Sequence, residues 1–500
     1  MKKFIHCIFV LPLLFMASCS PEIPEQYADV DTMPLIFPDY TGVTVPCNIA
    51  PLTFRIDNEA DKYVTRISSG DMELVVGGDE VVPSFEEWRG LVEVAKGGSM
   101  KVEVYAFDND SWKRYAPFEI FVSPDEIDPY ISYRLIPPSY VAYEKLTINQ
   151  RNLTNYDEEV IYSNMLVSAE PQGQCINCHA YKNYKTDNMQ FHVRQFKGGT
   201  IFIHDGEAKK VNLKTDSTIS AGVYPAFNPK YDVVAYSVNT TGQVFHTAHH
   251  NKVEVQDTLS DIIVYNPVKE TVTHVACDPN DLEVFPTWSP DGKSLYYGVA
   301  KVKCEDPVKS RVQQLIEGYK DIKYDIVRRS WNPETGVFGE PETVFAASSM
   351  GKSATFPRIS PCGRFLLVAF GEYGCFHIWH KDADLYVVDL ESGDFWPLEK
   401  ANSSFPESYH AWSSNGRWVL FASRRLDGNY SRLFIAYINE DGTSEKAFAL
   451  PQEHAGHYDF FDRSYNVPEF MVEPVRYTPQ ELAEIVKGES VTVKYVPNIK

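Results

Sequence analysis

Residues 175–179 read Cys-Ile-Asn-Cys-His, a run whose residue types could do chemistry at that spacing. Two thiols separated by two residues can form a disulfide, act as a redox dithiol, or supply half of a zinc site. They can also add to the two vinyl groups of a haem, and the adjoining histidine then becomes the proximal ligand of the iron. The run predicts one covalent c-type haem, attached through Cys175 and Cys178, with His179 on the iron. A disulfide or dithiol with His179 as a bystander stays open. Half of a zinc site also stays open, although no second C-x-x-C completes it.

The N-terminus indicates the compartment in which this chemistry would occur. Two lysines precede an apolar run over residues 4–17, a pattern that predicts a signal peptide over residues 1–18, too short to cross a bilayer. Residues 16–19, Met-Ala-Ser-Cys, resemble the bacterial lipobox, which implies lipidation at Cys19 and a membrane anchor in the bacterial cell envelope, periplasmic or at the outer membrane. An ordinary cleaved signal with an incidental cysteine is the alternative. Export favours haem, because c-type haem is attached outside the cytoplasm.

Charge argues against one class of partner. Removing residues 1–18 takes away two lysines, which leaves 45 basic and 68 acidic residues and a net charge of −23. This excess of negative charge predicts no nucleic-acid partner, since nucleic acids are bound through basic surfaces.

Four stretches of fourteen residues align without a gap, and each joins an aromatic residue, a short strand, a tight turn and a second strand. Three of the turns contain Ser-Pro-x-Gly or Ser-Ser-x-Gly, which suits a hairpin. Their spacings of 61, 71 and 53 residues are typical of propeller blades with loops of variable length. The stretches begin at Tyr224, Phe285, Phe356 and Tyr409. A second hairpin follows each, so that every unit has four strands.

These stretches resemble the TolB-like, WD40-like (PD40) propeller repeat, most specifically at Trp288-Ser-Pro-Asp-Gly and Trp412-Ser-Ser-Asn-Gly. The layout is similar to exported propeller lipoproteins with a C-x-x-C-H run, a group often labelled "cytochrome c biosynthesis protein". The resemblance implies a TolB-like β-propeller, for which six blades are favoured although five are recognisable. Cys178-His-Ala-Tyr aligns with Tyr409-His-Ala-Trp, which places the haem motif at the entry of the first blade.

A sixth ligand would determine the redox potential of the haem. The loop that holds His246, His249 and His250 should lie on the same face of the propeller as the motif, and His246 is the first candidate. His192 and Met189 are also possible distal ligands, although their odd separation points them to opposite faces of a strand. Each of the three is also explained by a solvated turn or by core packing.

Five cysteines lie outside the motif and the N-terminal region. Cys277 and Cys304 are expected in loops on one face of a blade, where a disulfide between them is possible. Cys362 and Cys375 are separated by a strand that is too long for a bridge.

The remaining segments complete the expected organisation. A tether over residues 19–29 leads to short alternating strands over residues 30–125, one of them at residues 90–94, a pattern typical of a small immunoglobulin-like β-sandwich. A connector over 126–170 precedes the propeller at 171–475. Residues 476–500 contain a helix that begins at Thr478 and a possible closing strand over 490–495.

No hydrolase motif occurs in the chain. The leading hypothesis is an anchored haem protein that acts in electron transfer or haem-coupled binding, with a redox or envelope protein as a partner at the propeller face. The alternative is a propeller that binds a protein or a glycan, with the haem structural or absent.

Overall fold

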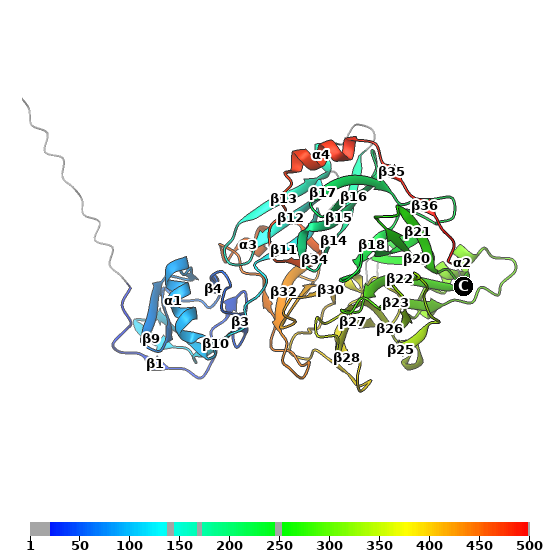
Figure 1. Ribbon diagram of the computed structural model, residues 1–500. Coiled ribbons are helices and arrows are strands. Elements are labelled where there is room, and N and C mark those ends of the chain that lie inside the picture. The colour runs from blue at the N-terminus through cyan, green and yellow to red at the C-terminus, as the bar shows by residue number, and fades with distance from the viewer. Residues whose placement is uncertain (1–20, 138–144, 168–172, 246–252, 499–500) are drawn as a thin grey trace, which may run out of the picture.

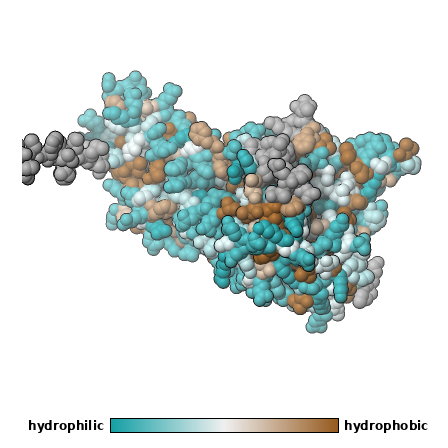
Figure 2. Space-filling model, turned by 90° about the horizontal axis from the view of Figure 1, so that it is seen from above, coloured by the Kyte–Doolittle hydropathy of each residue, from teal (hydrophilic) through white to brown (hydrophobic). Residues whose placement is uncertain are grey.

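The computed structural model describes residues 21–137, 145–167, 173–245 and 253–498. These residues form a β-rich N-terminal domain followed by a β-propeller (Figure 1). The expected signal peptide over residues 1–18, the lipidation site Cys19 and the candidate ligand His246 lie outside the described residues. No helix in the described parts of the chain has the length and apolar character needed to cross a bilayer. Seen from above, hydrophilic residues cover most of the surface and apolar residues gather in separate patches (Figure 2).

The N-terminal domain contains two sheets and one helix. In the larger sheet, β8 pairs with β5 along one edge and with β9 and β10 along the other. Its strands are β1 (Ala28–Asp29), β3 (Thr44–Pro46), β5 (Lys62–Ser69), β6 (Met72–Gly77), β8 (Ser99–Asp108), β9 (Ser111–Arg114) and β10 (Phe118–Ser123). The smaller sheet consists of β2 (Ile36–Phe37), β4 (Phe54–Ile56) and β7 (Glu80–Val81).

Helix α1 (Phe85–Ala95) is a correction to the expected sandwich, because alternation over residues 90–94 predicts a strand there. Ser84 caps the helix and forms a reciprocal capping box with Glu87. The buried side chains of α1 fall at helical spacing and pack into the core of the domain: Trp88, Leu91, Val92 and Ala95. Alternation over five residues is therefore a weaker signal than the cap that precedes it.

The recognised repeat forms five consecutive blades, and each blade is an antiparallel meander of four strands. The first blade contains β14 (Gln174–Lys182), β15 (Lys185–Gln195), β16 (Gly199–His204) and β17 (Glu207–Asn212). The second contains β18 (Val223–Phe227), β19 (Val234–Phe245), β20 (Val253–Asn266) and β21 (Thr271–Ala276). The third contains β22 (Asp281–Trp288), β23 (Ser294–Lys301), β24 (Asp325–Ser330) and β25 (Glu342–Phe345). The fourth contains β26 (Ser353–Ile359), β27 (Phe365–Gly371), β28 (Asp384–Asp389) and β29 (Phe395–Pro397). The fifth contains β30 (Glu407–Trp412), β31 (Trp418–Ser423), β32 (Arg432–Tyr437) and β33 (Phe448–Ala449).

The sixth blade, called here the closing blade, combines strands from distant parts of the chain. Its order is β34 (Ser464–Met471), β11 (Tyr130–Ile136), β12 (Thr147–Asn152) and β13 (Glu158–Ser163). Residues 130–163, expected as a connector, instead supply three of its four strands. Because β34 is its innermost strand and pairs antiparallel with β11, the ring closes between the beginning and the end of the propeller.

The C-terminal segment fastens the outside of the ring. Helix α4 (Pro479–Lys487) begins where the sequence predicts, with Thr478 as its cap, and packs against β13, β16 and β17. Strands β35 (Val491–Thr492) and β36 (Lys494–Tyr495) pair in parallel with β17 and β21. The expected closing strand therefore extends the outer edges of the first two blades and does not close the ring.

Short helices lie between the strands, in the loops at their ends. They are α2 (Arg311–Glu317), α3 (His457–Phe460), η2 (Asn164–Leu166), η3 (Tyr319–Asp321), η4 (Ala347–Met350) and η5 (His377–Trp379).

Every innermost strand carries the same irregularity. In each blade, a stretch of the innermost strand advances by three residues while the paired stretch of the second strand advances by two. The extra residue on the innermost strand defines a β-bulge. The first bulged residue has a positive φ of 47–56° in all six blades: Cys178, Tyr224, Phe285, Phe356, Tyr409 and Val467. We call these the axial residues, because rings from successive blades meet there: Tyr224 against Phe285, Phe285 against Phe356, and Phe356 against Tyr409.

Candidate functional site

The C-x-x-C-H run lies on β14, the innermost strand of the first blade, and Cys178 is the axial residue of that blade. The alignment of Cys178 with Tyr409 that the sequence predicts therefore matches the backbone conformation at both positions. Cys178 has a positive φ of 56° and Tyr409 one of 50°.

The three functional side chains of the run meet three different surroundings. Cys175 is partly exposed and packs against the apolar cluster shared by the first and closing blades. Cys178 is 2 % exposed and lies beside Tyr224 at the axis, where burial raises the pKa of its thiol. His179 is 1 % exposed and faces the backbone of Ser132 and Val467 in the closing blade.

The His179 ring is neutral. Burial is the main cause that lowers its pKa to about 3, the Arg134 guanidinium acts in the same direction, and the backbone of Ser132 and Val467 acts in the opposite direction. Neither ring nitrogen has a hydrogen-bond partner of good geometry. A bare imidazole nitrogen is what an iron ligand requires, so this observation alone suits a haem.

The surrounding packing does not fit a c-type haem. A porphyrin held by both thiols would have to lie against Cys175, Cys178 and His179 at once, and these side chains face a blade core, the axis and a neighbouring blade. A bare buried nitrogen is also not peculiar to the motif, because Nδ1 of His410 has no partner either. The motif on β14, as it is folded here, presents no common face to a haem.

The expected distal ligands have other partners or lie elsewhere. Met189 is fully buried in the apolar cluster between the first and closing blades. His192 lies opposite Asn177 and its Nδ1 is 3.1 Å from the Thr200 hydroxyl, which gives this side chain a structural role. His246 falls outside the described residues.

The expected disulfide between Cys277 and Cys304 is not formed, and both thiols are free. Cys277 is exposed just after β21, whereas Cys304 is partly buried after β23 and packs against the largest apolar cluster. The two loops were expected on one face, but a shared face does not bring two thiols to bonding distance. Within the described ranges, no group of three or more His, Cys, Asp or Glu side chains is placed to hold a metal ion.

A second candidate surface was not predicted from the sequence. It lies where three loops of the fourth and fifth blades adjoin, and we call it the loop shelf: Trp379, Lys381, Phe405, Arg424 and Gly428. The Arg424 guanidinium lies 4.3 Å from the centre of the Trp379 ring, and Lys381 Nζ lies 5.2 Å from the Phe405 ring. A Cβ on Gly428 would come within 3.1 Å of the Phe405 ring, which shows how closely those loops approach.

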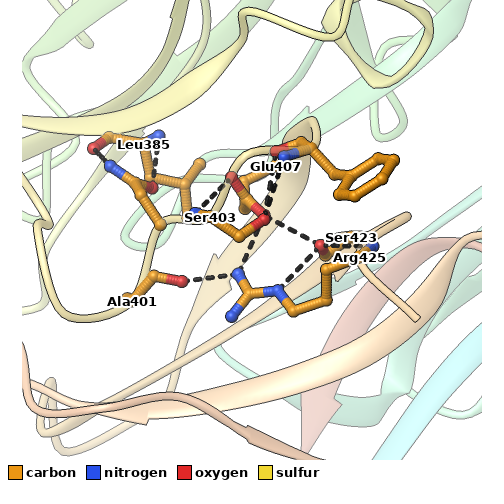
Figure 3. Close-up of polar contacts among 8 residues, drawn as sticks. Leu385, Ala401, Ser403, Glu407, Ser423 and Arg425 are labelled. Carbon is orange, nitrogen blue, oxygen red and sulfur yellow. Dashed lines mark hydrogen bonds and ion pairs between the residues drawn. The ribbon is translucent and has the colours of Figure 1, made fainter. Parts of the chain in front are cut away.

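A buried polar network joins the loops that carry Phe405 and Arg424 of the shelf, and its members include Ala401, Ser403, Glu407, Ser423 and Arg425 (Figure 3). Glu407 Oε1 accepts hydrogen bonds from the hydroxyls of Ser403 and Ser423 at 2.6 and 2.8 Å, and from Arg425 Nη2 at 2.8 Å. Arg425 also donates to the Ala401 carbonyl. Because Glu407 is fully buried, this charge-assisted network fixes the loop before β30 against the end of β31 and the loop that follows it. The residues Ser423-Arg-Arg that follow the fifth-blade repeat were the signal in the sequence that could have indicated it.

Comparison with protein-family models gives no match, and comparison with curated proteins gives none. Among solved structures, the chain is similar to an oligogalacturonate lyase from Vibrio parahaemolyticus, with 14% identity, a TM-score of 0.32, and coverage of 78% of this chain and 94% of that one. It is also similar to a putative 6-phosphogluconolactonase from Bacteroides fragilis, with 11% identity, a TM-score of 0.32, and coverage of 65% and 96%. The tricorn protease shares 11% identity at a TM-score of 0.34 over 91% of this chain and 36% of its own. No functional conclusion follows from these similarities.

Proposed function

We propose that the protein is a cell-envelope binding protein whose propeller holds a carbohydrate at the loop shelf. The observation that carries the proposal is the pair of partly exposed aromatic rings, Trp379 and Phe405, each with a cation over one face, next to a buried polar network. Aromatic faces provide apolar contact area, and nearby charged donors can bind hydroxyl or carboxylate groups. That combination suits the alternating apolar and polar surface of a sugar.

The position of the N-terminal domain bears on this choice of surface. Part of the contact between the domain and the fifth blade lies at the opposite end of the blade, where its strands join by short turns. Arg55 of the domain also pairs with Asp459 in the loop after β33, at the end of the blade that carries the shelf. Asp128 accepts hydrogen bonds from Ser414 in one turn, and Asp39 pairs with Lys446 just after another. The loop shelf is built from the loops at the other end of those strands.

Electron transfer through a covalent haem stays a prediction of the sequence. It is not the function proposed here, because the three side chains that the haem would need face different surroundings. The lipid anchor and the envelope location are likewise parts of the proposal that rest on the N-terminal sequence.

Binding to a glycan array, followed by calorimetry with the best ligand, tests the proposal. We expect Trp379→Ala to weaken binding by at least about tenfold, the equivalent of ~1.4 kcal/mol, because it removes the larger aromatic face. Trp112→Ala is the matched control, since Trp112 is a partly exposed tryptophan of the N-terminal domain and should not alter affinity. Absence of any glycan ligand, or equal affinity in the Trp379 variant and the wild type, would overturn the proposal.

A further inference from the structure

We infer that Cys178 and His179 are the axial and seam positions of the sixfold propeller repeat, and that the C-x-x-C-H run arises from this repeat and is not a haem attachment site. The seam position is the residue directly after each axial residue. In chain order from the first blade it is occupied by His179, Pro225, Pro286, Pro357, His410 and Pro468. The run is thus an axial cysteine and a seam histidine, preceded by the partly exposed Cys175.

His179 and His410 occupy equivalent surroundings. The His410 ring faces the preceding blade, where Nε2 lies 3.2 Å from the Leu367 carbonyl and the backbone of Phe356 is also close. The His179 ring faces the preceding blade in the same way, against the backbone of Ser132 and Val467.

The strand registers show that the two positions correspond in the repeat. Phe356 and Val467 are the axial residues of the preceding blades. Leu367 lies opposite Arg358, two residues after Phe356, and Ser132 lies opposite Glu469, two residues after Val467. Each histidine therefore faces the axial residue and the second strand of the blade before it.

His410 shares the burial of His179 and has one ring nitrogen, Nδ1, without a partner, whereas both ring nitrogens of His179 lack one. Both rings are 1 % exposed. No cysteine lies next to His410, whose neighbours are Tyr409 and Ala411. A buried imidazole at the seam is therefore produced by the repeat without any haem.

The proline at the other four seam positions suggests a test of whether His179 is a seam residue or an iron ligand. Residue 179 lies inside the bulge, between the register partners Asn177 and Ala180, and it pairs with no residue of β15. A proline at this position should therefore cost no ladder hydrogen bond. An iron ligand, in contrast, cannot be replaced by proline, which has no donor atom for the metal.

The experiment expresses the full chain with the haem-attachment machinery and records a pyridine haemochrome spectrum together with the mass of the intact protein. We expect no c-type band and no added mass for the wild type. His179→Pro and His410→Pro should both unfold cooperatively, with denaturant midpoints shifted by similar amounts.

A covalent haem band in the wild type that disappears in Cys175→Ala would overturn the inference. Cys175 is partly exposed and outside the seam, so this variant should fold and keeps the spectral test decisive if a proline variant does not fold. Loss of folding in His179→Pro alone, with His410→Pro folded, would also overturn the equivalence of the two positions.

Discussion

Glu283 shows that a glutamate at the same position of the repeat can have very different hydrogen-bond partners in different blades. It lies two residues before the axial Phe285, as Glu407 lies two residues before Tyr409. Glu407 has a guanidinium and two hydroxyls as partners, whereas Glu283 accepts one hydrogen bond from the Asp278 backbone N–H, and its Oε2 has no partner among the described residues. Burial is the main cause that raises the pKa of Glu283 to about 8; the charges of Asp261, Asp281 and Asp278 act in the same direction, and the hydrogen bond from the Asp278 backbone acts against them.

The raised pKa predicts a pH-dependent cost at Glu283. Because its folded-state pKa lies above the ordinary value of 4.5, the carboxyl binds a proton more tightly in the folded chain, and stability is lost as pH rises from 4.5 through about 8. Every tenfold gain in proton affinity on folding corresponds to about a tenfold change in the folding equilibrium once the pH exceeds both pKa values. Glu283→Gln should therefore match the wild type near pH 5 and be more stable than it at pH 9, as measured by urea midpoints. An equal difference at both pH values would contradict the assigned proton affinity.

At the scale of elements, the closing blade shows what the sequence could predict and what it could not. Five blades were recognisable because an axial residue, a tight turn and a second strand follow one another in the chain. In the closing blade the inner strand β34 and the second strand β11 are not joined by a turn, so the hairpin signal is absent. Asn466-Val-Pro-Glu keeps the proline of the repeat at Pro468 but replaces the aromatic residue with Val467. That proline was the remaining signal.

The candidate site was less predictable than the fold for a related reason. The motif at 175–179 is defined by residue types alone, and the repeat places those types in three separate surroundings. The loop shelf has no motif at all, since Trp379, Phe405 and Arg424 come from three loops that only the folded blades bring together. The periodicity of apolar residues predicts strands well, but it does not predict which loops lie side by side in the folded protein.

Two truncations test the role of β34. A chain that ends at Arg463 lacks the inner strand of the closing blade and leaves Ile131 and Tyr133 of β11 uncovered, so we expect no cooperative unfolding transition. A chain that ends at Glu489 loses only β35 and β36, which pair through two residues each, and should fold with a lower melting temperature. Circular dichroism melts of both chains provide the measurement. Equal melting behaviour of the two truncations would show that β34 is not what closes the ring.

At the scale of the whole molecule, the two domains share one apolar core. The largest cluster extends from Tyr40 and Val45 in the N-terminal domain to Leu433 in the fifth blade. Polar contacts cross the same boundary, among them the Tyr437 hydroxyl, which donates to Asp125 at 2.8 Å, and Trp418 Nε1, which donates to the Glu126 carbonyl. The N-terminal domain is therefore packed against the propeller and is not an independent domain joined to it only by a linker.

This shared core predicts that the domains unfold together. Differential scanning calorimetry of the chain should give one transition, because loss of either domain exposes apolar surface of the other. Tyr40→Ala removes a fully buried ring at the boundary and should lower the transition temperature of the whole molecule. Two resolved transitions in the wild type would contradict a common cooperative unit.

The composition of the closing blade also sets the order of events during folding. Strand β11 is made early in the chain, yet its inner partner β34 follows all the strands of the other five blades. The two strands of this pair are among the most distant in sequence of any pair in the described structure. Chain entropy must therefore be lost to bring them together before their contacts stabilise the fold. We therefore expect ring formation to be the slow step of refolding, with an exposed edge on β11 until the C-terminal segment arrives. During synthesis that edge stays without its inner partner until residues 464–471 have been made, which exposes it to pairing with other chains.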